Sequence, residues 1–387
     1  IYIMRRLLFI FSFLSLLVVD GKAQEVETLT LEDCLRIGID NNLSLEGKRK
    51  EIQKSKYGVS ENRSKLLPQI TVIAGYNNNF DPPVSVTDGS SYGVPYNITK
   101  TLQHTANAGL EMQMPLFNQT LYTSMSIAKV MEEISRLSYG KAREDIIMQI
   151  SKMYYLGQVT AEQIVLIKAN ITRLEELRDI TQAFFDNGMS MEVDLKRVNI
   201  NLENLKVQYD NAQAMMKQQL NMLKYIMDYP AEKEFVLTPV NTDSITTVAL
   251  TGLSENIYEL QLSQSQVQLA EKQKKIISNG YIPSLSLTGS WRYAAYTDKG
   301  YHWFHSGPSN HWFRSYGLGL TLRIPIFDGL DKTYKIKKAM IDIENSKLTW
   351  ENARKSLQTQ YLNAVNDLMN NQRNFKKQKD NYLLAED

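Results

Sequence analysis

The sequence predicts an α+β membrane protein, in which long antiparallel α-helical hairpins are combined with four transmembrane β-strands. Three observations predict this class. The stretch 109–118 alternates apolar and polar residues up to Pro115, and the pattern returns at 319–328 up to Pro325. The segments between these stretches are long, rich in helix-forming residues and poor in proline. The chain also begins with the pattern of an export signal.

The repeated stretch predicts a strand that runs directly into a helix. Strict alternation is the period of a strand with one apolar and one polar face. Proline ends the ladder of hydrogen bonds because it has no N–H to donate. Asn118 and Asp328 follow the two prolines closely, and their side chains suit the N-cap of a helix.

Residues 1–23 are predicted to be a secretory signal peptide. Met4-Arg5-Arg6 precedes an apolar run at 7–19, and Gly21 and Ala23 place small residues at a cleavage site. The run of 13 residues is shorter than the roughly 20 that a spanning helix needs. Removing the signal leaves equal numbers of basic and acidic side chains, which argues against nucleic acid as a partner. The single cysteine, Cys34, excludes a disulfide within the chain.

A first structural repeat is predicted at 24–228. Thr30 and Asp33 resemble a capping box, so one helix is expected from there to Leu67, before Pro68. Residues 68–80 alternate as a strand, and 81–103 are expected to form a long loop. The strand that ends near Pro115 then closes a hairpin.

The rest of this repeat is predicted to be a helical hairpin. Residues 116–229 contain no proline, and their apolar positions step by threes and fours. Two helices of about 65 and about 38 residues should meet at Asn187-Gly188, and the longer one would measure on the order of 100 Å. Gly188 suits a helix C′ position and Ser190 the next N-cap. A heptad seam follows along the second helix, at Leu195, Val198, Leu202, Leu205, Tyr209, Ala212 and Met216.

An irregular segment at 229–253 separates this repeat from a second, truncated one at 254–387. A helix is expected at 254–280, then a strand after Pro283, a loop at 297–312, the returning strand and a helix from 330 onward. The second hairpin turn and its return helix have no counterpart before Asp387, so the sequence is expected to be a fragment.

The strands suggest how the chain meets a membrane. An open sheet edge is not tolerated in lipid, and the smallest single-chain barrels have about eight strands. Four strands are therefore too few, and several copies of the chain must contribute strands to one barrel. Three copies would supply twelve strands. The polar strand face would line a water-filled lumen, and aromatic residues at the strand ends would form an interfacial girdle. The alternative is that this face is the solvated surface of a soluble sheet. The lumen candidates are Glu111, Gln113, Arg292, Thr321 and Arg323.

No catalytic or cofactor chemistry is predicted. The sequence contains no phosphate-binding loop, no nucleophile motif and no recognisable set of metal ligands. His302, His305 and His311 lie close together in the second loop, but their spacing matches no tight zinc pattern. We interpret them as polar loop residues, and we predict that the protein is not an enzyme.

In their order and duplication, these motifs resemble the TolC-type outer-membrane efflux proteins. The matching features are the stretch 29–43, Leu67-Pro68, the two Pro-x-Phe-[Asn/Asp] junctions and the turn at 185–190. The resemblance implies a homotrimer with a shared 12-stranded barrel in the outer membrane of a Gram-negative bacterium, continued by a helical barrel in the periplasm. It implies a passive export duct of a tripartite efflux or type I secretion system.

The resemblance also implies partners and gate residues. The hairpin tip would contact a periplasmic adaptor (membrane fusion) protein, which connects to an inner-membrane RND, ABC or MFS transporter. Asp194 lies where the family often has an acidic residue that narrows the periplasmic mouth. An alternative is a periplasmic coiled-coil adaptor or scaffold without a pore, which explains the helices but not the four strands. The tip candidates are Asp186, Asn187, Gly188, Met189 and Ser190.

Overall fold

The computed structural model describes residues 27–88, 90–100, 102–240, 254, 256–297 and 311–386. The predicted signal at 1–23, most of the irregular segment, His302 and His305 lie outside these residues. The chain packs as two compact units, one made of Ile1–Gly47 with Ala142–Ala249 and one of Lys48–Lys141 with Leu250–Asp387. These units are defined by which residues pack together, whereas the two predicted repeats are defined by similarity in sequence. The boundaries of the repeats therefore stay a prediction.

The first unit is built on helices that enclose a small apolar core. Strand β1 (Glu27–Leu29) pairs in parallel with β6 (Phe235–Leu237), which brings the N-terminal end of the described chain onto the segment after the hairpin. Sequence periodicity did not predict this pair, because three-residue strands carry too little pattern. The helices are α2 (Leu31–Asn41), the start of α3 (Leu43–Ser64), the end of α4 (Gln119–Asp186) and α5 (Glu192–Met227). The core includes Leu29, Cys34, Ile150, Tyr154, Leu223, Ile226, Met227 and Phe235.

The predicted capping box is confirmed, but the single helix expected after it is wrong. Thr30 Oγ1 accepts a hydrogen bond from the Asp33 N–H, and the Asp33 carboxylate accepts one from the Thr30 N–H. The helix breaks at Asn42, whose side chain caps α3 by accepting from the Leu45 N–H. Asn42 has a ψ of 119°, which is not helical.

The helical hairpin is confirmed, with α4 of 68 residues and α5 of 36. Gly188 has a φ of +75°, and the N–H groups of Gly188 and Met189 donate to the carbonyls of Phe185 and Phe184 in a Schellman motif. Leu195, Leu202 and Ala212 of the predicted seam are buried. Ser190 was predicted as the N-cap of α5, and this is wrong. The N-cap is Met191, which makes no side-chain capping bond.

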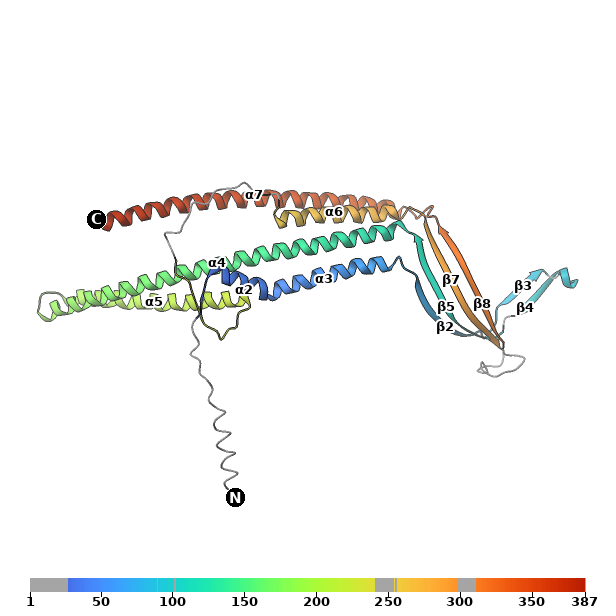
Figure 1. Cartoon of the computed structure of the whole chain (residues 1–387), viewed down its shortest axis with the longest axis horizontal. Helices are drawn as coiled ribbons and strands as arrows, with labels where there is room; N and C mark the ends of the chain where they lie inside the picture. Colours follow the sequence, from blue (N-terminus) through green and yellow to red (C-terminus); the bar gives the residue numbers. More distant parts are fainter. Residues whose placement is uncertain are drawn as a thin grey trace, which may run out of the picture. The chain divides into compact units, whose positions relative to one another are not determined.

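The second unit contains the predicted four strands, which form one antiparallel sheet in the order β2-β5-β7-β8 (Figure 1). Both edges of the sheet, β2 and β8, lack a further strand within the described residues. Helices α6 (Tyr258–Asn279) and α7 (Asp331–Glu386) pack against each other. The strands are β2 (Gln69–Asn78), β5 (His104–Phe117), β7 (Ser284–Thr297) and β8 (His311–Arg323).

The segment expected to be one long loop at 81–103 contains a second hairpin. Strands β3 (Val84–Asp88) and β4 (Tyr96–Lys100) pair antiparallel, and a short 3-10 helix, Ser90–Tyr92, lies between them. The prolines and glycines of this segment indicated a loop, but they are required only at the turns of the hairpin. The alternation of Val84 and Val86 with polar neighbours was the signal for a strand.

The two strand-to-helix junctions differ from each other. Strand β5 continues through Pro115 to Phe117 with a break in register, so the prediction that this proline closes the ladder is wrong there. Asn118 then caps α4 as predicted, because its Oδ1 accepts from the N–H groups of Thr120 and Leu121. Strand β8 ends at Arg323, before Pro325. No helix among the described residues is long and apolar enough to span a membrane.

Candidate functional site

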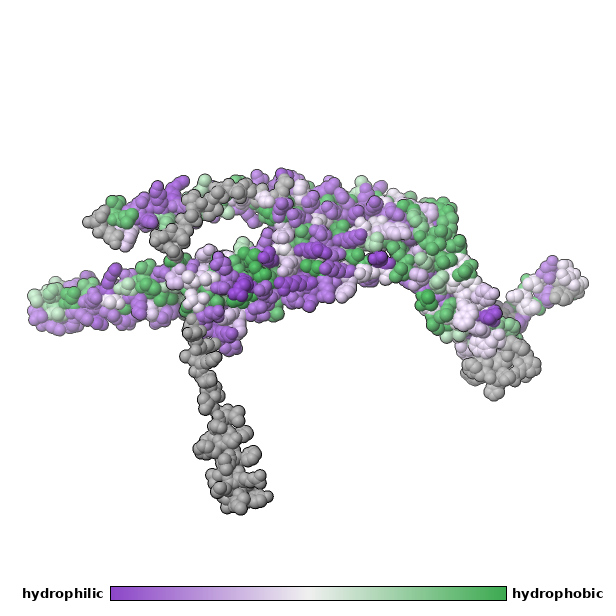
Figure 2. Space-filling view, viewed as in Figure 1, coloured by the Kyte–Doolittle hydropathy of each residue, from purple (hydrophilic) through white to green (hydrophobic). Residues whose placement is uncertain are grey.

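The four-stranded sheet carries large apolar side chains on one face. In register across the sheet, Val72 lies beside Leu110, Trp291 and Tyr316. Leu318 is 80 % exposed and Val72 is 73 % exposed in the single chain. A contiguous exposed apolar surface of this kind marks contact with a membrane or a partner. Figure 2 shows apolar side chains gathered over the strands. The face consists of Ile70, Val72, Ala74, Tyr76, Leu110, Met112, Met114, Leu285, Leu287, Trp291, Tyr293, Tyr316, Leu318, Leu320 and Leu322.

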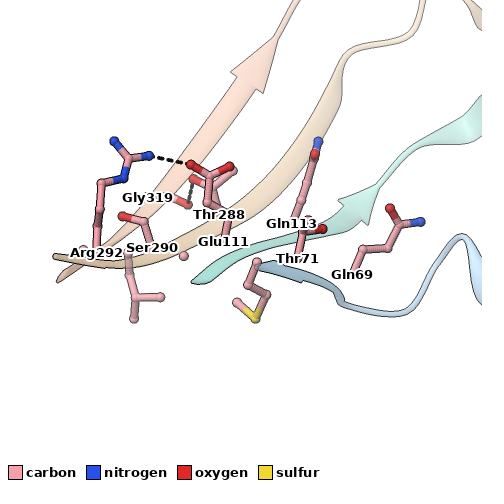
Figure 3. A pocket seen from close by; sticks show the side chains of 12 residues that line it. Gln69, Thr71, Glu111, Gln113, Thr288, Ser290, Arg292 and Gly319 are labelled. Atoms are coloured by element: carbon pink, nitrogen blue, oxygen red, sulfur yellow. Dashed lines mark hydrogen bonds and ion pairs between the residues drawn. The ribbon is translucent and has the colours of Figure 1, made fainter. Parts of the chain in front are cut away.

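The opposite face is polar and hollowed, with a concavity of about 630 Å³ (Figure 3). Its polar residues form rows across the sheet, because alternation places every second residue of each strand on the same side. One row is Gln69, Gln113, Thr288 and Gly319. The next row is Thr71, Glu111, Ser290 and Gly317. We call the residues of these rows, together with Arg292, Thr321 and Arg323, the polar face.

An ion pair joins two strands on the polar face. Arg292 Nη2 of β7 donates to Glu111 Oε1 of β5 at 2.5 Å, as the dashed line in Figure 3 shows. Arg292 lies directly opposite Gly109, so the two charged residues are diagonal neighbours in the ladder. Both side chains remain accessible, at 41 % for Arg292 and 47 % for Glu111. The pair is therefore a solvent-facing link between strands rather than a buried one.

The structure brings three of the five predicted lumen residues together. Glu111, Gln113 and Arg292 line the hollow. Thr321 pairs with Ser286 further along the same face. Arg323 pairs with Ser284 at the end of β8, is exposed, and has no acidic partner among the described residues.

The lumen prediction left out Gln69, Thr71 and Thr288, which also line the hollow. Their positions follow from the same alternation.

Aromatic residues lie at the far end of the strands from the helices. The Tyr76 and His104 rings stack with centroids 6.0 Å apart, and Tyr76 Oη lies 2.8 Å from His104 Nδ1. The Tyr296 and Phe313 rings are 6.2 Å apart. Trp291 and Tyr293 meet edge to face on the apolar side, 5.4 Å apart. Amphipathic rings in such positions suit a boundary between lipid and water.

The predicted tip residues lie at the exposed turn between α4 and α5, in the other unit. Asp186 Oδ1 accepts from Gln182 Nε2 at 2.8 Å, and Asn187 Nδ2 donates to the Ala183 carbonyl at 2.7 Å. Met189 is 68 % exposed. Asp194 lies in the first turn of α5, 3.7 Å from Arg197 Nη1, with 52 % of its side chain exposed. Its carboxylate is thus available to a group outside this chain.

Among the described residues, no three His, Cys, Asp or Glu side chains are close enough together to hold a metal ion. Of the three histidines interpreted as loop residues, His302 and His305 lie outside the described part of the chain. His311 is the first residue of strand β8, so its assignment to the loop is wrong. Polar groups of the described polar face line one hollow. They are suited to lining an aqueous surface beside lipid.

Comparison with known proteins identifies this architecture. A family model described as outer membrane efflux protein matches residues 37–227. The outer membrane protein TolC of Vibrio cholerae is 21 % identical over 316 residues, which cover 80 % of this chain and 66 % of that protein. This chain therefore spans slightly less than two thirds of the length of that relative.

Solved structures share the fold. CusC, described in terms of transmembrane channel formation, superposes with a TM-score of 0.70 at 16 % identity, over 92 % of this chain and 80 % of CusC. The MtrE outer membrane channel of Neisseria gonorrhoeae, in its open state, gives a TM-score of 0.66 at 18 % identity, over 90 % of this chain and 74 % of MtrE. The fold is thus that of the TolC-type outer-membrane channels. The chain belongs to the outer membrane efflux protein family.

Proposed function

We propose that this chain is one protomer of an outer-membrane efflux channel in a Gram-negative bacterium, and that the channel is a passive export duct. The observation that carries the proposal is the two-faced sheet with two open edges. Its apolar face is suited to outer-membrane lipid and its polar face to a water-filled lumen. An open edge in lipid would leave backbone N–H and C=O groups unpaired, so the edges must find partners.

Strand direction supports closure by identical copies. The sheet is antiparallel throughout, so its edge strands β2 and β8 run in opposite directions. Strand β8 of one copy can therefore pair antiparallel with β2 of the next, and the alternation continues around a ring. A head-to-tail interface of this kind closes when the rotation permits it. Three copies would give a barrel of about twelve strands, which is an even number within the range of outer-membrane barrels.

The helical hairpin supplies the periplasmic end in this proposal. The exposed turn Asp186–Ser190 would contact a periplasmic adaptor protein, and an inner-membrane RND, ABC or MFS transporter would supply the energy. The chain itself would perform no catalysis. Asp194 would attract basic groups of neighbouring copies and hold the mouth narrow until the adaptor docks. Tripartite efflux and type I secretion both fit such a duct.

The test uses the full-length protein, expressed with its own export signal and extracted from outer membranes in detergent. We expect the mass of a trimer by light scattering, and we expect stepwise ionic conductance after insertion into planar lipid bilayers. A monomer that stays soluble without detergent and inserts no conductance would overturn the proposal. That result would instead support a periplasmic scaffold without a pore.

A further inference from the structure

We propose that Arg323 gives the outer-membrane part of the lumen an excess positive charge, so that this part of the duct favours anionic solutes. This inference rests on the proposed function, because the polar face must line the lumen. It concerns the class of solute, which neither the fold nor the family determines.

The polar face carries more basic than acidic side chains. Alternation assigns every second residue of each strand to this face, from Gln69 in β2 to Arg323 in β8. The charged side chains among these described positions are Glu111, Arg292 and Arg323. The other described positions of the face carry no Asp, Glu, Lys or Arg, and His311 lies at the opposite end of β8 from Arg323. Each copy thus contributes one carboxylate and two guanidinium groups.

The carboxylate of Glu111 is already paired with Arg292. Glu111 Oε1 accepts from Arg292 Nη2 at 2.5 Å, so these two charges largely cancel at a distance. Arg323 lies at the end of β8 that leads to the helices, opposite the uncharged Ser284. No described carboxylate lies within ion-pair distance of its guanidinium, and the side chain is exposed. The remaining charge is therefore that of Arg323.

The neighbouring residues of β8 on the polar face do not screen the charge of Arg323. The polar face of β8 continues with Thr321 and then with Gly319 and Gly317, which have no side chains beyond hydrogen. In a trimer, three such guanidinium groups would lie at one level of the lumen. A water-filled passage with low-dielectric walls focuses the field of such charges and raises the local concentration of counter-ions.

The experiment measures ion selectivity of the full-length channel in planar bilayers, as the reversal potential under a KCl gradient. Arg323→Gln should lower the permeability ratio of chloride to potassium by about twofold or more, because the focused positive field is removed. Arg323→Glu should lower it further. Glu111→Gln should raise the ratio, because it releases the charge of Arg292. The variants are compared with the unmodified channel, which carries the same charges elsewhere in the duct, Asp194 included.

Arg314 provides the matched control. It lies on the same strand but on the apolar face, 5.9 Å from the centroid of the Tyr316 ring. Arg314→Gln removes the same charge from β8 and should leave the permeability ratio unchanged. If Arg323→Gln and Arg314→Gln channels conduct with the ratio of the unmodified channel, the inference is wrong while the channel function stands. If the unmodified protein inserts no conductance, the proposed function itself fails.

Discussion

Asn42 Nδ2 donates a hydrogen bond to the Ile226 carbonyl at 2.7 Å, across 184 residues of sequence. The Oδ1 of the same side chain accepts from the Leu45 N–H at 3.1 Å, and the side chain is buried. One amide thus caps the first turn of α3 and satisfies a carbonyl in the last turn of α5. Both groups would otherwise be unpaired backbone atoms at helix ends. The break between α2 and α3 is therefore a packing feature of the first unit.

Asn42→Ala should lower the free energy of unfolding by about 2–3 kcal/mol, because it removes a helix cap and leaves a buried carbonyl without its donor. The loss would be measured by urea titration of the helical circular dichroism signal in detergent. Asn41→Ala is the control, since Asn41 is the adjacent exposed asparagine. Equal midpoints for the two variants would contradict a structural role for the Asn42 amide.

Gly109→Ala should prevent normal pairing of β5 with β7. A Cβ on Gly109 would lie 2.8 Å from the Arg292 Cα and closer still to the Trp291 carbonyl oxygen, and neither backbone atom can move without breaking the ladder. We expect loss of the assembled species on non-denaturing gels after extraction from membranes. Gly317→Ala on the same face is the control, because no atom lies within 4 Å of the added Cβ. Normal assembly of the Gly109 variant would show that the strands are not packed this closely.

Cys34 should be chemically inert in the folded protein at pH 8. Burial raises the pKa of its thiol to about 12, and the neighbouring Asp33 carboxylate adds to the shift. The neutral thiol therefore contributes stability that is fully present below the unfolded pKa of about 8.5 and that is lost as the pH rises toward the folded pKa. Labelling by a thiol-specific disulfide reagent should be at least tenfold slower in the folded protein than in guanidinium chloride. Fast labelling without denaturant would show that the Cys34 thiol is not buried.

Asp194→Asn should increase single-channel conductance if the carboxylate holds the mouth narrow. The physical reason is the loss of attraction between Asp194 and basic groups of neighbouring hairpins. Glu203→Gln is the matched control, because Glu203 pairs with Lys206 three residues later on α5, as Asp194 does with Arg197, but lies further from the turn. Conductance that rises equally in both variants, or in neither, would assign Asp194 an ordinary role near a helix N-terminus.

The local elements could be predicted from the sequence because their signals are local. The alternation within β5 and β8 assigns their residues to two faces, whichever strands lie beside them. The capping box and the turn at Gly188 each form within one helical turn. The hairpin of β3 and β4 was missed because the three prolines of 81–103, together with Gly, Ser, Asp and Asn, are typical of a loop. The break at Asn42 was missed for another reason: the residues on both sides have helical periodicity.

The amino-acid sequence by itself determined the two-faced strands, the long helical hairpin and the polar residues available to line a lumen. Only the tertiary structure decided that β5 lies beside β7, that Arg292 meets Glu111, and that Asn42 reaches Ile226. The physical reason is the range of the interactions. Periodicity and capping arise between residues a few positions apart. The Arg292–Glu111 and Asn42–Ile226 contacts join residues more than 180 positions apart, and they depend on how whole elements pack.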